Sequence, residues 1–169
     1  EILEKPFGDL TLGLSHAGDR YTIDMALTNQ GSNLTAKGYY VSNPTTSSFD
    51  LSANFDPLNL QAIEPLSFGQ LQKVEGRATG TLKISGTFEK PVIRGTISFR
   101  EASFKSTYLN SSFTLKNESI TFNEQGIRLN NFTITDTKKN DAVLDGSILT
   151  DAYRDFRFNM RLTTRNFQV

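Results

Sequence analysis

Apolar and polar residues alternate along most of this chain with a period of two residues. Residues 21–28 are typical and read Tyr-Thr-Ile-Asp-Met-Ala-Leu-Thr. Because successive side chains of a β-strand point to opposite faces, the pattern predicts strands with one apolar face and one polar face. The same alternation recurs in residues 10–15, 34–40, 49–55, 77–85, 93–99, 113–115, 120–122, 127–134, 142–148 and 156–163.

Short polar turns separate nearly every pair of these segments, for example at His16–Asp19 and Asn29–Ser32. Strands joined by such turns pair with their neighbours in the sequence. We therefore expect roughly eleven or twelve strands in an all-β antiparallel meander. The alternation slips by one position at Asn130-Asn131, which predicts a β-bulge or a kink there.

One interval, from Asp56 to Glu75, breaks the alternation. Its apolar residues are spaced irregularly, two prolines punctuate it, and Leu60 and Ile63 fall on one side of a helical turn. This predicts one short helix near residues 58–66. We expect a single unit over residues 1–169, with the first strands in 1–55, a short helix or turn in 56–75 and a second meander in 76–169.

The apolar face of these strands must be covered, and the sequence allows three ways to cover it. A sandwich would bury the face against a second sheet. A closed barrel would bury it inside, and a strongly curved sheet would leave it lining a groove. Periodicity alone does not choose among the three.

Composition excludes several classes of function. The chain has no Cys, so it forms no disulfide and no thiolate metal site. Its 18 basic and 18 acidic residues balance, which argues against nucleic acid as a partner. No stretch approaches about 18 uninterrupted apolar residues, so we expect no transmembrane helix. The chain starts abruptly at Glu1 within strand-like sequence, and we expect it to be a section of a longer protein.

No recognisable catalytic site is present. His16, the only histidine, falls in a predicted turn and is expected to be solvated. Gly80 is followed by Thr-Leu-Lys-Ile, which is strand-like, whereas a phosphate loop needs Lys-Ser/Thr opening a helix. Asp136–Asp141 is short for a calcium loop and lacks a glycine, so we expect a solvated hairpin tip. We predict no enzymatic activity, no metal and no cofactor.

A glycine-punctuated segment gives the chain a family resemblance. From Gly76 to Phe99 it reads GRATGTLKISGTFEKPVIRGTISF, with Pro91 before the last glycine, Gly95. This resembles the hallmark of the TamB family, relatives of AsmA. The strand-like segments that follow, over residues 119–167, are similar to the closing meander of the family. The resemblance covers about residues 45–169, and its final stretch is most similar to the Bacteroidetes branch.

The resemblance implies both a fold and a role. Family members are anchored in the inner membrane and cross the periplasm of Gram-negative bacteria as a long curved sheet. That sheet is folded into a taco-like trough with an apolar interior. They are linked to outer-membrane biogenesis, through transfer of phospholipids and, with a partner barrel of the Omp85 family, through assembly of outer-membrane proteins. This chain lacks the anchor and would be an internal section of the trough. Its partners would be phospholipid acyl chains and nascent outer-membrane proteins.

The candidate site is the apolar lining of that trough, which would hold acyl chains or a client strand. The residues expected to line it are Leu82, Ile84, Ile97, Phe99, Phe113, Leu115, Ile120, Phe122, Leu144, Ile148, Phe156, Phe158 and Met160. Bends and turns are expected at Gly76, Gly80, Gly86, Pro91 and Gly95. The alternative is a secreted β-sandwich for binding or adhesion, whose apolar face would be sealed in a core.

Overall fold

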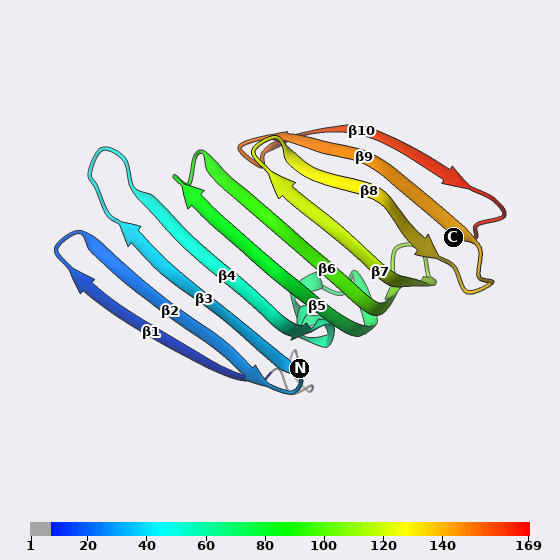
Figure 1. Cartoon of the computed structure of the whole chain (residues 1–169), viewed down its shortest axis with the longest axis horizontal. Helices are drawn as coiled ribbons and strands as arrows, with labels where there is room; N and C mark the ends of the chain where they lie inside the picture. The colour runs from blue at the N-terminus through cyan, green and yellow to red at the C-terminus, as the bar shows by residue number, and fades with distance from the viewer. Residues whose placement is uncertain (1–7) are drawn as a thin grey trace.

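The computed structural model describes residues 8–169, which form one sheet of ten antiparallel strands in chain order (Figure 1). This confirms the predicted all-β meander. The strands are β1 (Asp9–Ala17), β2 (Arg20–Asn29), β3 (Ser32–Val41), β4 (Ser48–Asn59), β5 (Leu71–Gly86), β6 (Pro91–Ser106), β7 (Ser111–Asn123), β8 (Gly126–Thr135), β9 (Asp141–Asp151) and β10 (Asp155–Thr164).

The number of strands is lower than expected because two strands continue through a change of phase. In β8 the pairing with β9 shifts between Leu129 and Phe132, and Asn131 has a φ of 48°. The predicted bulge at Asn130-Asn131 is thereby confirmed. In β7 the exposed pair Lys116 and Asn117 interrupts the alternation, yet the ladder with β6 continues on both sides. Such irregularities change which residues face inward without ending a strand.

Two short 3₁₀ helices lie between β4 and β5, where one short helix was predicted. They are η1 (Leu60–Ile63) and η2 (Pro65–Ser67). The side chain of Asn59 caps η1 by accepting a hydrogen bond of 3.0 Å from the backbone N–H of Gln61. Since β4 continues to Asn59 and β5 starts at Leu71, the segment without strand is narrower than residues 56–75.

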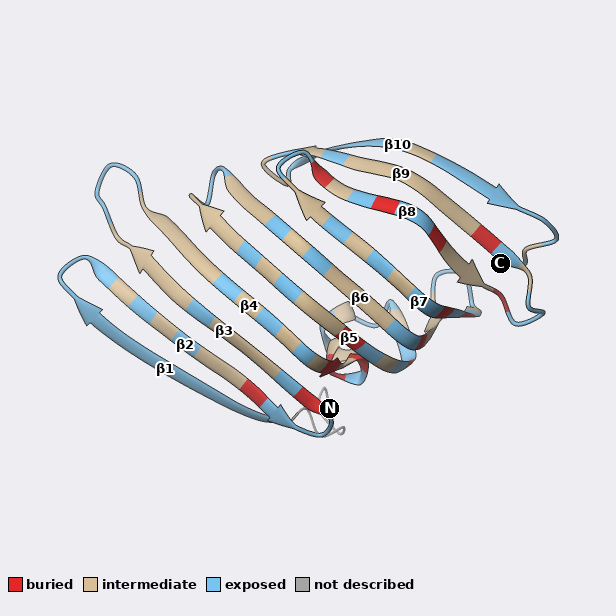
Figure 2. Ribbon diagram, in the orientation of Figure 1, coloured by how far each residue is buried: buried red, intermediate tan, exposed pale blue. Residues whose placement is uncertain are grey.

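The segment η1 packs on the apolar face of the sheet near one end of the strands. Leu60 and Ala62 are buried there, in one cluster with residues of β2, β4, β5, β6, β7 and β8. Figure 2 shows buried positions of β2, β3 and β5 close to these helical turns. The members of the cluster are Leu27, Leu58, Leu60, Ala62, Val74, Ala78, Ala102, Leu115, Leu129 and Phe132.

The sheet is curved and open. In Figure 1 the strands β8 to β10 turn away from the direction of β1 to β4. Within residues 8–169, β1 pairs only with β2, β10 pairs only with β9, and no second sheet covers the apolar face. The sealed sandwich considered above is therefore not formed by this part of the chain. The described residues contain no helix that is long and apolar enough to cross a membrane.

Candidate functional site: an apolar face across ten strands

The pairing register brings apolar residues of all ten strands into one continuous row. We call this row A, and it runs from β1 to β10 without a charged residue. Each member is the register partner of the next, so the row crosses the sheet at right angles to the strands. Its members are Leu12, Met25, Ala36, Ala53, Leu82, Gly95, Phe122, Ile127, Ile148 and Phe158.

A second row, row B, lies beside row A, two residues away on each strand. It also crosses all ten strands and also contains no charged residue. Its members are Leu10, Leu27, Leu34, Phe55, Gly80, Ile97, Ile120, Leu129, Gly146 and Met160. With strands spaced about 4.8 Å apart, ten strands give each row a length of roughly 43 Å.

Large and small side chains complement one another between the two rows. On β4 the small Ala53 of row A lies beside the large Phe55 of row B, and on β5 the order is reversed, with Leu82 beside Gly80. The remaining pairs of small and large neighbours are Ala36 with Leu34, Gly95 with Ile97, and Gly146 with Ile148. The combined bulk of the two rows therefore changes little in this part of the sheet.

Two glycines in these rows allow β5 and β6 to approach each other closely. Gly80 has a φ of +143°, and a Cβ added there would lie 2.0 Å from the carbonyl oxygen of Thr96. Gly95 has a φ of +139°, and its added Cβ would lie 2.0 Å from the carbonyl oxygen of Thr81. No other residue type fits this backbone. Gly76 and Gly86 also lie in β5, and Pro91 opens β6 as the register partner of Gly86.

The apolar face is hollowed at two places. The first hollow has a volume of about 540 Å³ and lies at the ends of β1 to β5 that are farther from η1. The second hollow, of about 350 Å³, lies at the opposite strand ends, among β5 to β10. The first is lined by Leu14, Tyr21, Ile23, Tyr40, Phe49, Leu51, Ile84 and Phe88. The second is lined by Leu71, Phe104, Ser106, Leu109, Phe113, Ile134, Ala142, Leu144, Leu162, Phe167 and Val169.

The residues predicted to line the trough are distributed over these features. Row A contains Leu82, Phe122, Ile148 and Phe158, whereas row B contains Ile97, Ile120 and Met160. Ile84 lines the first hollow, and Phe113 and Leu144 line the second. Contact of any of these residues with a lipid or client strand stays a prediction.

The other three predicted residues differ in how accessible they are. Leu115 is buried in the core cluster, where only 8 % of its surface is exposed, and it offers little surface to a ligand. Phe99 packs against that cluster, with its ring edge-on to Phe132 at 6.5 Å. Phe156 lies on β10 opposite Thr150 and is half exposed.

Sequence reasoning missed most of the first hollow. Its lining from β1 to β4 includes Leu14, Ile23 and Leu51, none of which was among the predicted lining residues. The signal was available, because these residues belong to the same alternation as the later strands. The family resemblance, which starts near residue 45, drew the prediction toward the C-terminal strands.

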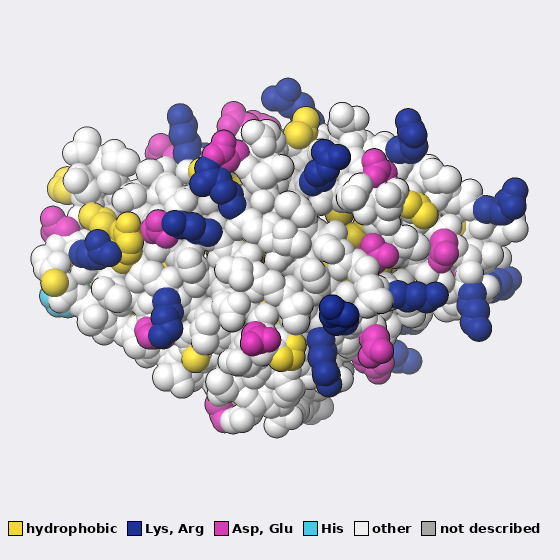
Figure 3. All heavy atoms as spheres, viewed as in Figure 1, with side chains coloured by type: hydrophobic (Ala, Val, Ile, Leu, Met, Phe, Trp, Pro, Cys, Tyr) yellow, Lys and Arg dark blue, Asp and Glu magenta, His cyan; other side chains and the backbone are white. Residues whose placement is uncertain are grey.

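The opposite face of the sheet is polar. Figure 3 shows charged side chains of both signs spread among uncharged polar groups, with few hydrophobic atoms between them. Neighbouring strands form ion pairs there: Lys37 lies 2.9 Å from Asp24, and Lys83 lies 3.4 Å from Asp50. These pairs are exposed and add little stability, but they keep this face in water.

His16 differs from its predicted place. It belongs to β1 rather than to the turn, which is reduced to Gly18 and Asp19. Its side chain is exposed, as expected, and lies on the same face as Leu14, with its ring 5.7 Å from that of Tyr21. The part of the chain that the structure describes contains no group of three or more His, Cys, Asp or Glu residues that could hold a metal.

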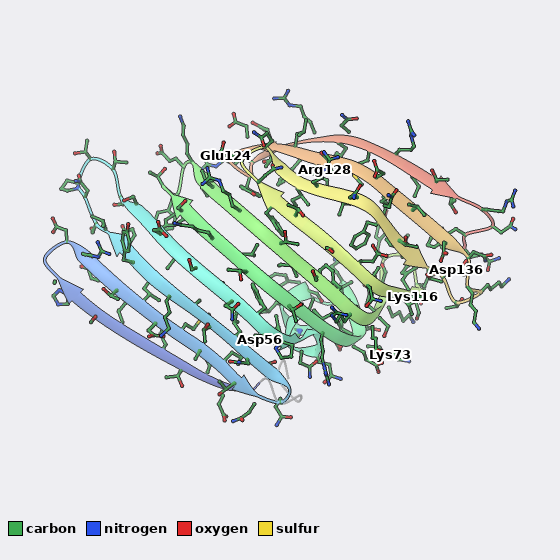
Figure 4. The ribbon with its side chains drawn as sticks, viewed as in Figure 1. Asp56, Lys73, Lys116, Glu124, Arg128 and Asp136 are labelled. Atoms are coloured by element: carbon green, nitrogen blue, oxygen red, sulfur yellow. The ribbon has the colours of Figure 1, made fainter. Side chains whose placement is uncertain are left out.

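The predicted solvated hairpin tip at Asp136–Asp141 is confirmed for its exposed residues Thr137–Lys139 and Asp141, but Asp136 departs from it. Only 5 % of Asp136 is exposed. Burial alone would raise the pKa of its carboxyl group. Hydrogen bonds from the Asn140 side chain and from the backbone N–H groups of Asn140, Gln168 and Lys138 outweigh this and lower the pKa to about 2. Figure 4 places Asp136 near the C-terminus that Figure 1 marks, so it fastens two distant segments.

Comparison with known proteins gives one match. The family model for the TamB C-terminal domain matches residues 22–130, which is more than half of the chain. No curated protein and no solved structure matches. The match includes the glycine-punctuated segment and most of β2 to β5 around the first hollow, but not β1, and it agrees with the single open, curved sheet. The chain therefore belongs to the TamB family of transport and assembly modules, which act in outer-membrane biogenesis in the Gram-negative envelope.

Proposed function

We propose that the apolar face is a section of a conduit that carries phospholipid acyl chains across the periplasm, between the inner and the outer membrane. The observation that carries this proposal is the pair of uncharged apolar rows that cross all ten strands. A closed core would need no continuity from one edge of the sheet to the other. The inner-membrane anchor of such a protein would lie outside the described residues.

The energetics favour a continuous apolar path for this cargo. Transfer of an acyl chain into water costs about 0.8 kcal/mol for each CH₂ group, so roughly fifteen groups cost about 12 kcal/mol. Row A, none of whose members is buried, would cover the chain along its length while the head group stays in water at the open side. Row B is covered in part, because Leu27 and Leu129 belong to the buried core cluster. No polar group in either row competes for the cargo, so the path would lower the barrier without trapping the lipid.

The test is lipid binding by a variant that leaves the core intact. Phe158 is 72 % exposed on β10 and belongs to row A. Phe158→Glu places a charge in the path and should strongly reduce the phospholipid retained by the protein, as measured by native mass spectrometry. Asn159→Glu, on the exposed polar face of the same strand, is the matched control. Ile97 is less suitable because it packs against the core cluster, where a charge would also cost stability.

The outcomes separate the conduit from its rivals. Loss of bound phospholipid in Phe158→Glu alone, with an unchanged circular dichroism spectrum, would support the conduit. A wild-type protein that retains no phospholipid, and transfers none between donor and acceptor vesicles, would overturn it.

A second candidate cargo is a nascent outer-membrane strand, handled together with a partner of the Omp85 family. The observation that favours it is the pair of open edges, since all nine residues of β1 are exposed and its outer side is unpaired within residues 8–169. Such an edge can accept an added strand through main-chain hydrogen bonds. Protection of β1 amides from hydrogen exchange by an added outer-membrane hairpin peptide, without protection by lipid, would favour this cargo.

A further inference from the structure

The first hollow has an aromatic margin. We call this margin the aromatic row; it consists of His16, Tyr21, Tyr40, Phe88 and Phe49. Successive ring centroids lie 5.7, 6.0, 5.9 and 5.2 Å apart, so the rings touch from β1 to the β5–β6 turn. All five lie at strand ends or in a turn, at the ends of the strands that are farther from η1.

The lining of the hollow changes from aromatic residues at this margin to aliphatic residues farther inward. Behind the rings, two residues away on β1, β2 and β4, the lining is aliphatic and consists of Leu14, Ile23, Leu51 and Ile84. The polar atoms of the tyrosines are therefore confined to the margin.

Two phenol groups in the aromatic row have hydrogen-bonding capacity to spare. Tyr21 and Tyr40 are register partners on the apolar face, and both are half-buried. Neither hydroxyl group forms a hydrogen bond with another residue in the part of the chain that the structure describes. A tyrosine side chain is stable where its ring contacts apolar groups and its hydroxyl contacts polar groups. A ligand that displaces water from this margin binds better if it brings a hydrogen-bonding group, and an acceptor satisfies the O–H donor of each phenol.

We propose that the first hollow binds the acyl chain of a phospholipid in one orientation, with its ester carbonyl at the hydroxyls of Tyr21 and Tyr40. The tail lies on the aliphatic residues behind the rings, and the head group projects past the strand ends into water. This inference rests on the proposed conduit and adds the orientation of the lipid and the residues that select its ester linkage.

A lipid fits this hollow better than a client peptide. The backbone groups of β2, β3 and β4 are paired with neighbouring strands on both sides, so the floor that these strands form offers no main-chain partner. The edge of β1, unpaired within residues 8–169, lies at the side of the hollow, to which β1 contributes only Leu14. An extended peptide laid there would leave its own N–H and C=O groups without partners, at a cost of about 1–3 kcal/mol for each buried group. An acyl chain has no such groups, and its ester provides acceptors at the one place where donors are available.

The experiment removes the two hydroxyls and keeps both rings. The double variant Tyr21→Phe/Tyr40→Phe is compared with the wild-type chain for binding of a diacyl phosphatidylglycerol and of its dialkyl ether analogue, which lacks the ester carbonyls. We expect the wild type to prefer the ester lipid by roughly three- to tenfold, the effect of one or two hydrogen bonds, and the variant to lose this preference. Tyr39→Phe, on the polar face beside Arg20, is the matched control.

A cross-linking measurement tests where the lipid binds. A phosphatidylglycerol with a photoreactive group on the first carbons of its acyl chain should label the peptides that contain Tyr21 and Tyr40. Labels confined to other strands would overturn the oriented site. A variant that keeps the full preference for the ester lipid would overturn the site but leave the conduit standing. If the wild type binds neither lipid, both proposals fail.

Discussion

Asp136 carries out a structural task that depends on its ionised state. Its carboxylate accepts hydrogen bonds from the β8–β9 turn and from the backbone N–H of Gln168, which follows β10. The adjacent Phe167 stacks on Phe113 with ring centroids 5.7 Å apart, so this bond holds one wall of the second hollow in place.

The lowered pKa of Asp136 makes this contribution dependent on pH. Because the folded-state pKa of about 2 is below the usual 3.8, the stabilisation is complete above pH 3.8 and is lost as the pH falls toward 2. We expect Asp136→Asn to lower the melting temperature at pH 7 and to reduce the difference in melting temperature between pH 7 and pH 2.5. Asp24→Asn, which removes an exposed ion pair, should change both far less. Equal effects of the two substitutions would contradict this assignment.

Gly80 and Gly95 are among the residues least able to tolerate a side chain. Gly80→Ala and Gly95→Ala place a methyl group against a neighbouring carbonyl oxygen and impose a positive φ on alanine. Strain at such positions costs on the order of 1–3 kcal/mol, before the clash is counted. We expect a corresponding loss in the free energy of unfolding, measured by urea denaturation.

The control for this prediction is another glycine within a strand. Gly13 of β1 has an ordinary backbone, and a Cβ added there would meet nothing closer than 3.5 Å. Gly13→Ala should therefore leave stability nearly unchanged or raise it slightly. A similar loss at all three positions would point to a general effect of strand glycines rather than to the close approach of β5 and β6.

At the scale of elements, the 3₁₀ segment between β4 and β5 covers part of the apolar face. Leu60 is only 4 % exposed, whereas Leu66 of η2 is 65 % exposed. Leu60→Ala should destabilise the sheet by about 2–5 kcal/mol, the usual cost of emptying a buried leucine site. Leu66→Ala should cost less than about 0.5 kcal/mol. Chemical denaturation of the two variants tests whether η1 is part of the core or only lies against it.

The strands were predictable to different degrees. Where the alternation is unbroken, as in residues 20–29, the sequence predicts both the strand and its inward face. It does not predict that β7 continues across Lys116 and Asn117, because a shift of phase in one strand looks like two short strands. Continuity there depends on the ladder with β6, and such pairing between distant residues leaves no local signal.

At the scale of the whole molecule, the pairing register shows which residues of neighbouring strands lie side by side, which periodicity along one strand does not show. Alternation identifies which residues share a face on each strand, and the sequence left open how that face is covered. Ten strands in chain order convert those separate faces into rows A and B. Seven of the thirteen predicted lining residues fall in these rows because they share this alternation. Alternation also marks Leu14, Ile23 and Leu51 as inward-facing, but it does not show that Tyr21, Tyr40 and Phe88 meet across three segments to outline the first hollow. The assignment to the Bacteroidetes branch stays a prediction.

Across β3 to β6 the evenly shared bulk of rows A and B has a kinetic consequence for the proposed conduit. Small residues of one row lie there beside large residues of the other, so an apolar cargo would meet a similar surface at each step. The free-energy profile over these strands would be nearly level, and motion along it would be one-dimensional diffusion. Such a path would have no direction of its own, so net flux would follow the difference in lipid supply between its two ends. The mean crossing time would grow with the square of the path length, which would make the number of strands a determinant of transport rate.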